Sequence, residues 1–205
     1  MPRLRLCRVL HVIVSDVPRT SLIIVLALLY TGCASSRTQP ASRPSDAKAL
    51  EEFQKKIGEF AELHHQLESQ LPPLPSQAPP AQVQAHRTAL ADLIMSARRP
   101  AKQGDIFVSD VEPLIRERAE TVFASLQGPQ DKADIQEEQS ERDVPARVNQ
   151  RYPDDVPVST VTAHVLASLP LLPAELQYRF LGRHLILIDT GARIIVDYMP
   201  NVLPR

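Results

Sequence analysis

Proline is the residue that most limits how this chain can fold. The sequence has 19 prolines and only 6 glycines, and a proline inside a helix or a central strand removes a backbone hydrogen-bond donor. Two prolines lie in the first 20 residues, and the others mostly lie between segments with a regular hydrophobic period. We therefore expect short helices and strands joined by stiff connections.

The composition excludes several classes of protein. At 205 residues the chain has the length of one domain, or of one domain with a small appendage. Its formal net charge of −1 excludes a strongly basic nucleic-acid-binding protein. Two cysteines are too few for a disulfide framework or a four-thiolate zinc site. Hydrophobic residues make up 43% of the chain, which is enough for a buried core.

The N-terminal segment has the pattern of a secretory signal peptide. Four arginines and one aspartate lie within residues 1–20, an apolar run follows at residues 22–29, and small residues follow that run. The apolar run is much shorter than the ~20 residues that a membrane-spanning helix needs. We therefore expect an export signal peptide rather than a transmembrane helix.

The end of this segment, Thr31-Gly32-Cys33, resembles the lipobox of bacterial lipoproteins, with Tyr30 where that family usually has leucine. The resemblance implies that residues 1–32 are removed as a signal peptide and that the thiol of Cys33 is acylated. Several acyl chains on one cysteine would anchor the protein firmly in a membrane. The alternatives are an ordinary signal peptide, giving a soluble periplasmic or secreted protein, and an uncleaved anchor.

The residues after the cysteine indicate where the lipoprotein would go. Ala34-Ser35-Ser36 lacks the aspartate that retains such proteins in the inner membrane, so the resemblance implies the outer membrane, facing the periplasm. Residues 33–45 are small, polar and proline-bearing, which is typical of a tether. Removal of residues 1–32 changes the formal charge from −1 to −4, because four arginines and one aspartate are lost.

The next region, residues 46–128, has the pattern of about three amphipathic helices. Large apolar residues spaced three and four apart predict a helix over residues 46–71. A second helix should begin at Pro79-Pro80 and stop before Pro100. Ser109 and Glu112 have the spacing of a capping box for a third helix, which should end at Gly128-Pro129. Leu126 should be among the inward-facing residues of that helix.

The remaining sequence predicts a linker and then a small sheet. Residues 129–157 are acidic and proline-rich, and we expect a solvated helix or a loose linker there. Within residues 158–205, a short helix with Leu166 facing inward should precede a three-stranded antiparallel meander. Two-residue loops would set Phe180 against Leu185, and Leu187 against Ile194. The fold class is therefore α+β, with the helices covering the sheet.

From Leu71 onward the chain resembles a family of uncharacterised bacterial proteins. This resemblance implies no activity, cofactor or catalytic residue. The segments that carry this resemblance are Leu71-Pro72-Pro73-Leu74, residues 101–107, Val148-Asn149, Tyr152-Pro153, residues 169–176 and the strands from 178 to 198. The resemblance implies that residues 46–205 form one unit.

Histidines and carboxylates near the end of the first predicted helix, together with one histidine of the second, are the candidates for a metal site. Glu62 and His65 have the E-x-x-H spacing that places both on one helix face, but a dinuclear carboxylate site needs a second such motif. The weak candidates are Glu62, His64, His65, Glu68 and His86. The alternative is that His64 and His86 lie along helix seams as partly buried polar residues while His65 is exposed, and we expect no metal or other cofactor.

His184 and Asp197 are the candidates for a catalytic pair. The expected register places them opposite each other on neighbouring strands, where the carboxylate could orient the imidazole as a base. The sequence supplies no nearby nucleophile, so a cross-strand surface pair is the alternative. The mixed apolar and charged residues on that face of the sheet suggest that a partner or another segment covers it.

These patterns favour a non-enzymatic interaction or assembly module of the cell envelope, anchored at the outer membrane. Its partners would be the membrane, through the lipid, and possibly an envelope protein, but not nucleic acid. A periplasmic metal-binding or metal-sensing helical domain is one alternative. An enzyme with a site assembled around His184 and Asp197 is another.

Overall fold

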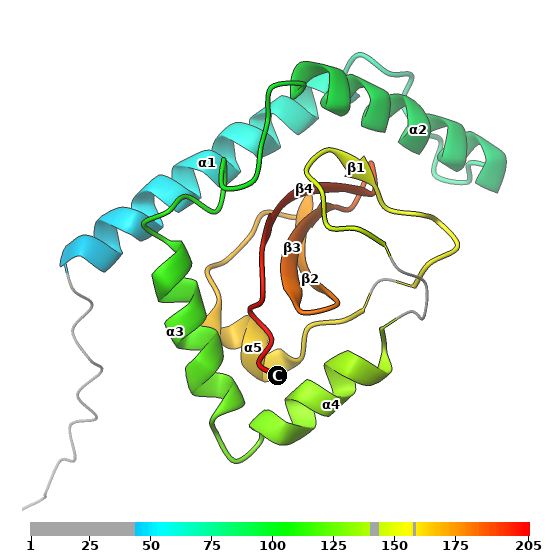
Figure 1. Cartoon of the computed structure of the whole chain (residues 1–205). Coiled ribbons are helices and arrows are strands. Elements are labelled where there is room, and N and C mark those ends of the chain that lie inside the picture. Colours follow the sequence, from blue (N-terminus) through cyan, green and yellow to red (C-terminus); the bar gives the residue numbers. More distant parts are fainter. Residues whose placement is uncertain (1–43, 140–143, 158) are drawn as a thin grey trace, which may run out of the picture. The chain divides into compact units, whose positions relative to one another are not determined.

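The computed structural model describes residues 44–139, 144–157 and 159–205, all within one compact unit that spans residues 40–205. The described residues form five helices and four strands. In chain order they are α1 (Pro44–Glu68), α2 (Pro80–Ala97), α3 (Glu112–Phe123), α4 (Gly128–Glu137), β1 (Gln150–Arg151), α5 (Ala163–Ser168), β2 (Leu176–Leu181), β3 (His184–Asp189) and β4 (Ile194–Met199). The fold is mixed helix and sheet, as the sequence predicts. Figure 1 shows the helices around the sheet, with α1 and α2 along one side of it and α4 at the opposite side.

The hydrophobic spacing of α1 and α2 explains how these two helices pack. Phe53, Ile57, Phe60 and His64 follow one another at intervals of three and four residues and are all buried. On α2, Leu90 and Ile94 are buried in the same core. Pro80 occupies the first turn of α2, where no backbone N–H is needed.

The ends of α3 differ from the sequence prediction. Val111 is its N-cap and no side chain caps the helix, because the hydroxyl of Ser109 bonds to Asp110 instead. The helix ends at Phe123, and Gly128-Pro129 begins α4 rather than ending α3. Leu126 lies in the turn between the two helices and is fully exposed, which corrects its predicted inward position.

Part of the expected acidic linker is integrated into the core. α4 forms at its start, from Gly128 to Glu137, and Asp131 and Ile135 of this helix are buried. β1 forms near its end and joins the sheet. On the following helix, α5, Val165 is buried but Leu166 is 43% exposed, so Leu166 does not face inward as predicted.

The sheet has four antiparallel strands in the order β1-β4-β3-β2, one more than the predicted meander. The predicted register of the first hairpin is confirmed, since Phe180 pairs with Leu185 and Tyr178 pairs with Leu187. Gly182 occupies the left-handed region in the turn between them, with φ of +56°. β1 adds a short strand at the free edge of β4, where Gln150 pairs with Ile195.

The predicted register of the second hairpin is wrong. Asp189 pairs with Ile194 across a four-residue turn, and a bulge at Val196 then sets Leu187 opposite Asp197 instead of Ile194. A bulge adds one residue to one strand and changes the face to which the following side chain points. Simple alternation assumes an unbroken ladder and therefore misplaces Asp197.

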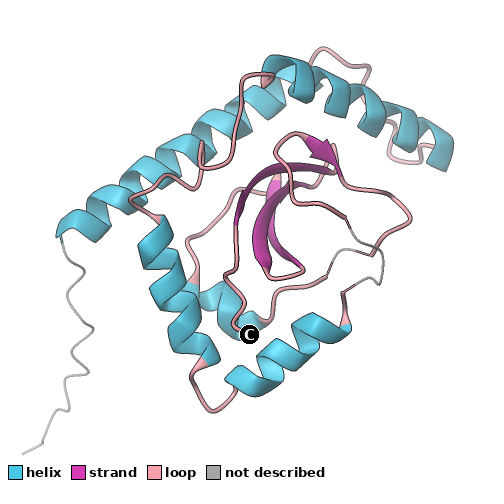
Figure 2. Cartoon of the chain, in the orientation of Figure 1, coloured by secondary structure: helices cyan, strands magenta, loops and turns pink. Residues whose placement is uncertain are grey.

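Both faces of the sheet are covered by other parts of the chain. Figure 2 shows the helices and loops that surround the strands. One face packs against the helices in a core that includes Phe107, Phe180 and Leu185. The other face forms a smaller apolar cluster whose members are Val144, Tyr152, Val156, Ile186, Ile188 and Ile195. The cover that the sequence required for this second face is thus supplied by residues 144–157 of the same chain. Within the described residues, no helix combines the length and the hydropathy needed to cross a membrane.

Candidate functional site

The connection between α2 and α3 is fixed to the sheet by the carboxylate of Asp197. One oxygen accepts from the backbone N–H of Ile106 at 2.8 Å and of Phe107 at 2.9 Å. The other accepts from Gly104 at 3.0 Å and from Tyr198 at 2.8 Å. Burial raises the pKa of the Asp197 carboxyl, and these four N–H groups oppose that shift. We call residues 101–109 the anchored loop.

Arg98 and Asn149 support the start of this loop. The Arg98 guanidinium donates to the carbonyl of Val196 at 3.0 Å and lies 5.2 Å from the centre of the Phe60 ring. Asn149 returns a hydrogen bond from its side-chain amide to the carbonyl of Arg98 at 2.5 Å. Its backbone is left-handed, with φ of +58°, a conformation that asparagine adopts more readily than most residues.

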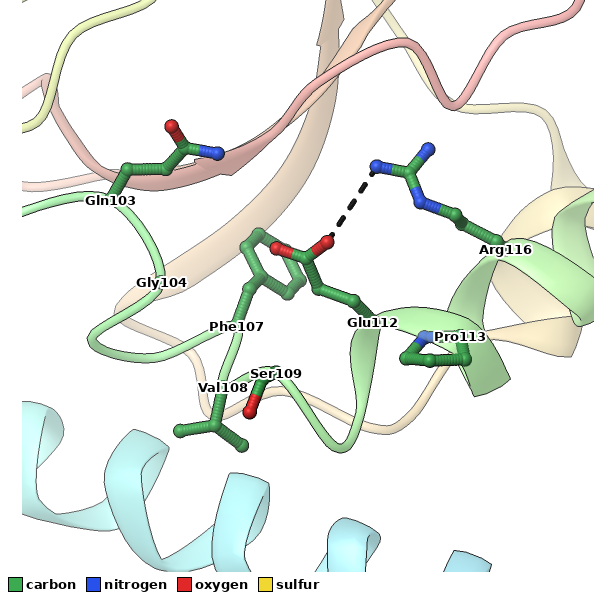
Figure 3. Close-up of a pocket in the computed structure, with 8 residues that line it drawn as sticks. All are labelled: Gln103, Gly104, Phe107, Val108, Ser109, Glu112, Pro113 and Arg116. Atoms are coloured by element: carbon green, nitrogen blue, oxygen red, sulfur yellow. Dashed lines mark ion pairs between the residues drawn. The ribbon is translucent and has the colours of Figure 1, made fainter.

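A pocket of about 640 Å³ lies beside the anchored loop. Its lining residues are Gln103, Gly104, Phe107, Val108, Ser109, Glu112, Pro113 and Arg116. Figure 3 shows the side chains of Glu112 and Arg116 pointing toward each other, with the ring of Phe107 behind Glu112. We call this hollow the loop pocket.

Contacts with the C-terminal segment hold one wall of the loop pocket. Arg116 donates to the carbonyl of Pro200 at 2.7 Å and to that of Asn201 at 3.3 Å. Its guanidinium also lies 3.7 Å from the Glu112 carboxylate. A cation and an anion therefore occur together in the pocket, each already oriented by the fold.

A second hollow of about 460 Å³ shares Gly104 and Val108 with the first. Lys56 and Glu59 of α1 and Asp105 of the anchored loop contribute charged groups to it. Gly104 and Val108 of the anchored loop thus line two hollows, and each hollow has both polar and apolar lining residues. Such an arrangement is suited to binding, because oriented polar groups fix a ligand while apolar surface contributes affinity.

The loop pocket does not contain a base–nucleophile pair. Its hydroxyl group, that of Ser109, donates to the carboxylate of Asp110 at 3.2 Å. An activated serine needs a base that is held within hydrogen-bond reach, usually an imidazole. None of the lining residues is a histidine or a cysteine. The polar side chains that line this pocket are those of Gln103, Ser109, Glu112 and Arg116.

The structure brings three of the candidate metal ligands into one chain of contacts. Nδ1 of His64 lies 2.6 Å from the Asp189 carboxylate, and Nε2 of His64 lies 3.6 Å from one oxygen of Glu68. The other oxygen of Glu68 lies 3.6 Å from Nε2 of His86. Burial acts to lower the pKa of His64, but the hydrogen bond and charge of Asp189, together with Glu68 and Glu175, raise it overall.

The other two candidates point elsewhere. His65 bonds through Nε2 to the Glu175 carboxylate at 2.7 Å, and Glu62 accepts from the amide of Gln66 at 2.9 Å. The described part of the chain contains no group of three or more His, Cys, Asp or Glu side chains that could hold a metal ion. The predicted seam positions agree with the burial of His64 and the exposure of His65.

His184 and Asp197 do not form the predicted pair. His184 lies opposite Leu181, and its Nδ1 accepts from the backbone N–H of Asn201 at 3.3 Å. Burial, followed by the nearby charge of Arg183, lowers the pKa of His184. The bulge at Val196 instead directs Asp197 to the anchored loop. The site proposed around these two residues is therefore corrected.

Sequence reasoning missed the role of Asp197 as an anchor and the role of Asp189 as the partner of His64. The proposed lipidation site, Cys33, lies outside the described residues. Comparison of the chain with protein-family models, with curated proteins and with solved structures gives no match.

Proposed function

We propose that this chain is a cell-envelope lipoprotein whose folded unit binds another envelope protein without catalysing a reaction. The observation that carries the binding role is the loop pocket, whose lining combines polar and charged side chains with apolar ones. The location rests on the sequence that ends in Thr31-Gly32-Cys33, which supports acylation of Cys33 and anchoring at the outer membrane, facing the periplasm.

The contacts around the loop pocket support recognition rather than turnover. Asp197 fixes the backbone of the anchored loop at three positions, so the pocket wall is formed before a ligand arrives. A preformed site loses less conformational entropy on binding. Arg116 and Glu112 supply one donor and one acceptor of opposite charge. The partner chemistry that fits is an exposed polar segment with an apolar side chain to contact Val108 and Pro113.

The anchor is tested by changing the acylated residue. The Cys33→Ser variant and the wild-type chain would be expressed in a bacterium fed with a labelled fatty acid. We expect label on the wild-type chain only, and we expect the variant to fractionate away from the outer membrane. Label retained on Cys33→Ser would contradict the proposed lipidation site.

The partner is tested by crosslinking in cells. A photoreactive amino acid at Ser109 lies at the rim of the loop pocket, and the same group at exposed Gln82 of α2 provides the control. We expect one defined protein adduct from position 109, absent from position 82 and weakened by Arg116→Gln. Equal adducts from both positions would contradict the proposed surface.

A further inference from the structure

A third, smaller pocket is lined by arginines from three separate parts of the chain. It has a volume of about 140 Å³ and lies between α2, the segment after β1 and the turn that joins β3 to β4. Its charged lining residues are Arg87, Arg151, Asp154 and Arg193. We call it the arginine pocket. A water molecule takes ~30 Å³ in the liquid, so this pocket has room for a small polyatomic ion and little more.

Two donors that belong to lining residues of the arginine pocket make no hydrogen bond. The Nε atoms of Arg87 and Arg193 are buried, and neither makes a hydrogen bond. Arg193 uses another nitrogen to donate to the carbonyls of Pro153 at 2.8 Å and Val156 at 3.1 Å, which holds its guanidinium in place. Buried donors nearly always have a hydrogen-bond acceptor. A buried donor without one has lost its hydrogen bonds to water and gains none in the protein, which destabilises the fold.

Asp154 neutralises only part of the positive charge of the arginines that line the pocket. Its carboxylate accepts from Gln84 at 2.6 Å and from Arg87 at 3.1 Å, and lies 3.3 Å from Nε of Arg193 without the alignment of a hydrogen bond. Arg151 is engaged outside the pocket, with Asp92 at 2.5 Å. The lining thus has three cations and one anion, and that anion is 46% exposed.

We propose that the arginine pocket binds a small oxyanion, namely a phosphate or carboxylate group, between the guanidinium groups of Arg87 and Arg193. Guanidinium groups offer paired N–H donors that match the oxygens of such anions. Asp154 then acts as a competitor within the chain, because its carboxylate uses the same donors. This site is separate from the loop pocket, so its presence does not depend on the proposed partner-binding function.

Inorganic phosphate and acetate are the probes, each added to the full-length protein in detergent. Nitrogen-15 spectra resolve the Nε–H groups of arginine side chains. We expect the Nε–H signals of Arg87 and Arg193 to shift on titration while that of exposed Arg99 stays unchanged. A stronger response to phosphate identifies a phosphate group as the ligand, and a stronger response to acetate identifies a carboxylate. No response to either probe, or an equal response at Arg99, would overturn the proposal.

Substitutions separate a binding role from a structural one. Arg87→Gln and Arg193→Gln should each weaken binding of the better probe about tenfold, and Arg99→Gln, in the exposed turn that follows α2, should leave it unchanged. Asp154→Asn should strengthen binding several-fold, since it removes the competing carboxylate. A merely structural Asp154 would give no such gain. Unchanged affinity in Asp154→Asn together with unchanged affinity in Arg87→Gln would refute the site.

Discussion

Nδ1 of His64 and Oδ2 of Asp189 lie 2.6 Å apart in the core, although 125 residues separate them in the sequence. The other oxygen of Asp189 accepts from the backbone N–H of Ala192 at 2.6 Å. One buried carboxylate therefore joins α1 to the end of β3 and shapes the turn that follows. Gly191 lies in this turn, where an added Cβ would come within 3.1 Å of the His64 ring.

The His64–Asp189 pair predicts a stability that depends on pH. Because the pKa of His64 is raised above 6.5 in the folded state, its contribution to stability is fully present below pH 6.5. This contribution is lost as the pH rises through the raised pKa of the folded state. We expect the free energy of unfolding, measured with urea, to fall over that window. The charges that face the imidazole are those of Asp189, Glu68 and Glu175.

The control for this prediction lies on the same helix. His65 is 57% exposed, and the neighbouring variant His65→Gln should retain most of the pH dependence. His64→Gln should remove it and lower stability at pH 6. An unchanged slope in His64→Gln would show that another group is responsible.

Removal of the Asp197 carboxylate should release the anchored loop. Asp197→Ala leaves the N–H groups of Ile106 and Phe107 buried without an acceptor. Since each such group costs ~1–3 kcal/mol, we expect a loss of at least ~2 kcal/mol in urea unfolding. Amide hydrogen exchange should accelerate at both positions. Asp110→Ala, which removes an exposed carboxylate nearby, should have little effect on either measurement.

Two helical glycines predict opposite effects of the same substitution. A Cβ on Gly128 would lie 2.0 Å from the carbonyl oxygen of Phe123, and that oxygen belongs to the backbone. A Cβ on Gly58 would meet nothing within 4 Å. Gly128→Ala should therefore destabilise the protein by several kcal/mol, whereas Gly58→Ala, inside α1, should stabilise it by up to ~1 kcal/mol. Thermal unfolding of the two variants tests the contrast.

Asn149 combines a left-handed backbone with a hydrogen bond to Arg98. Asn149→Gly keeps the backbone conformation accessible but loses the side chain, whereas Asn149→Ala loses both. We expect Asn149→Ala to reduce stability more than Asn149→Gly, by ~1 kcal/mol, the usual penalty for a left-handed residue with a Cβ. Equal losses in urea unfolding would assign the whole effect to the hydrogen bond.

The elements with a long regular period could be predicted from the sequence. The spacing of Phe53, Ile57 and Phe60 gives one face of α1, and alternation fixes the pairing of Phe180 with Leu185. Both patterns depend on contacts between neighbours in the chain or across one tight turn. The spacing of apolar residues along the chain reveals these contacts directly, because positions that face the core are occupied by apolar residue types.

The candidate sites could not be predicted in the same way. Asp197 accepts hydrogen bonds from backbone N–H groups of the anchored loop. Almost every residue type has such a group, so the side chains at positions 104–107 do not reveal the contact. The bulge at Val196 is likewise invisible to a pattern of alternating residues. The arginine pocket draws Arg87 and Arg193 from segments that no motif connects. Tertiary packing decides all three features.

The two edges of the sheet offer little backbone for pairing with the sheet of a second copy. At the β2 edge, Ser159 forms an isolated bridge with Phe180 and donates its hydroxyl hydrogen bond to the same residue. At the other edge, β1 is only two residues long. Short or occupied edges leave few free backbone groups with which a second sheet could pair. Copies held side by side on a membrane would therefore resist joining into a continuous sheet.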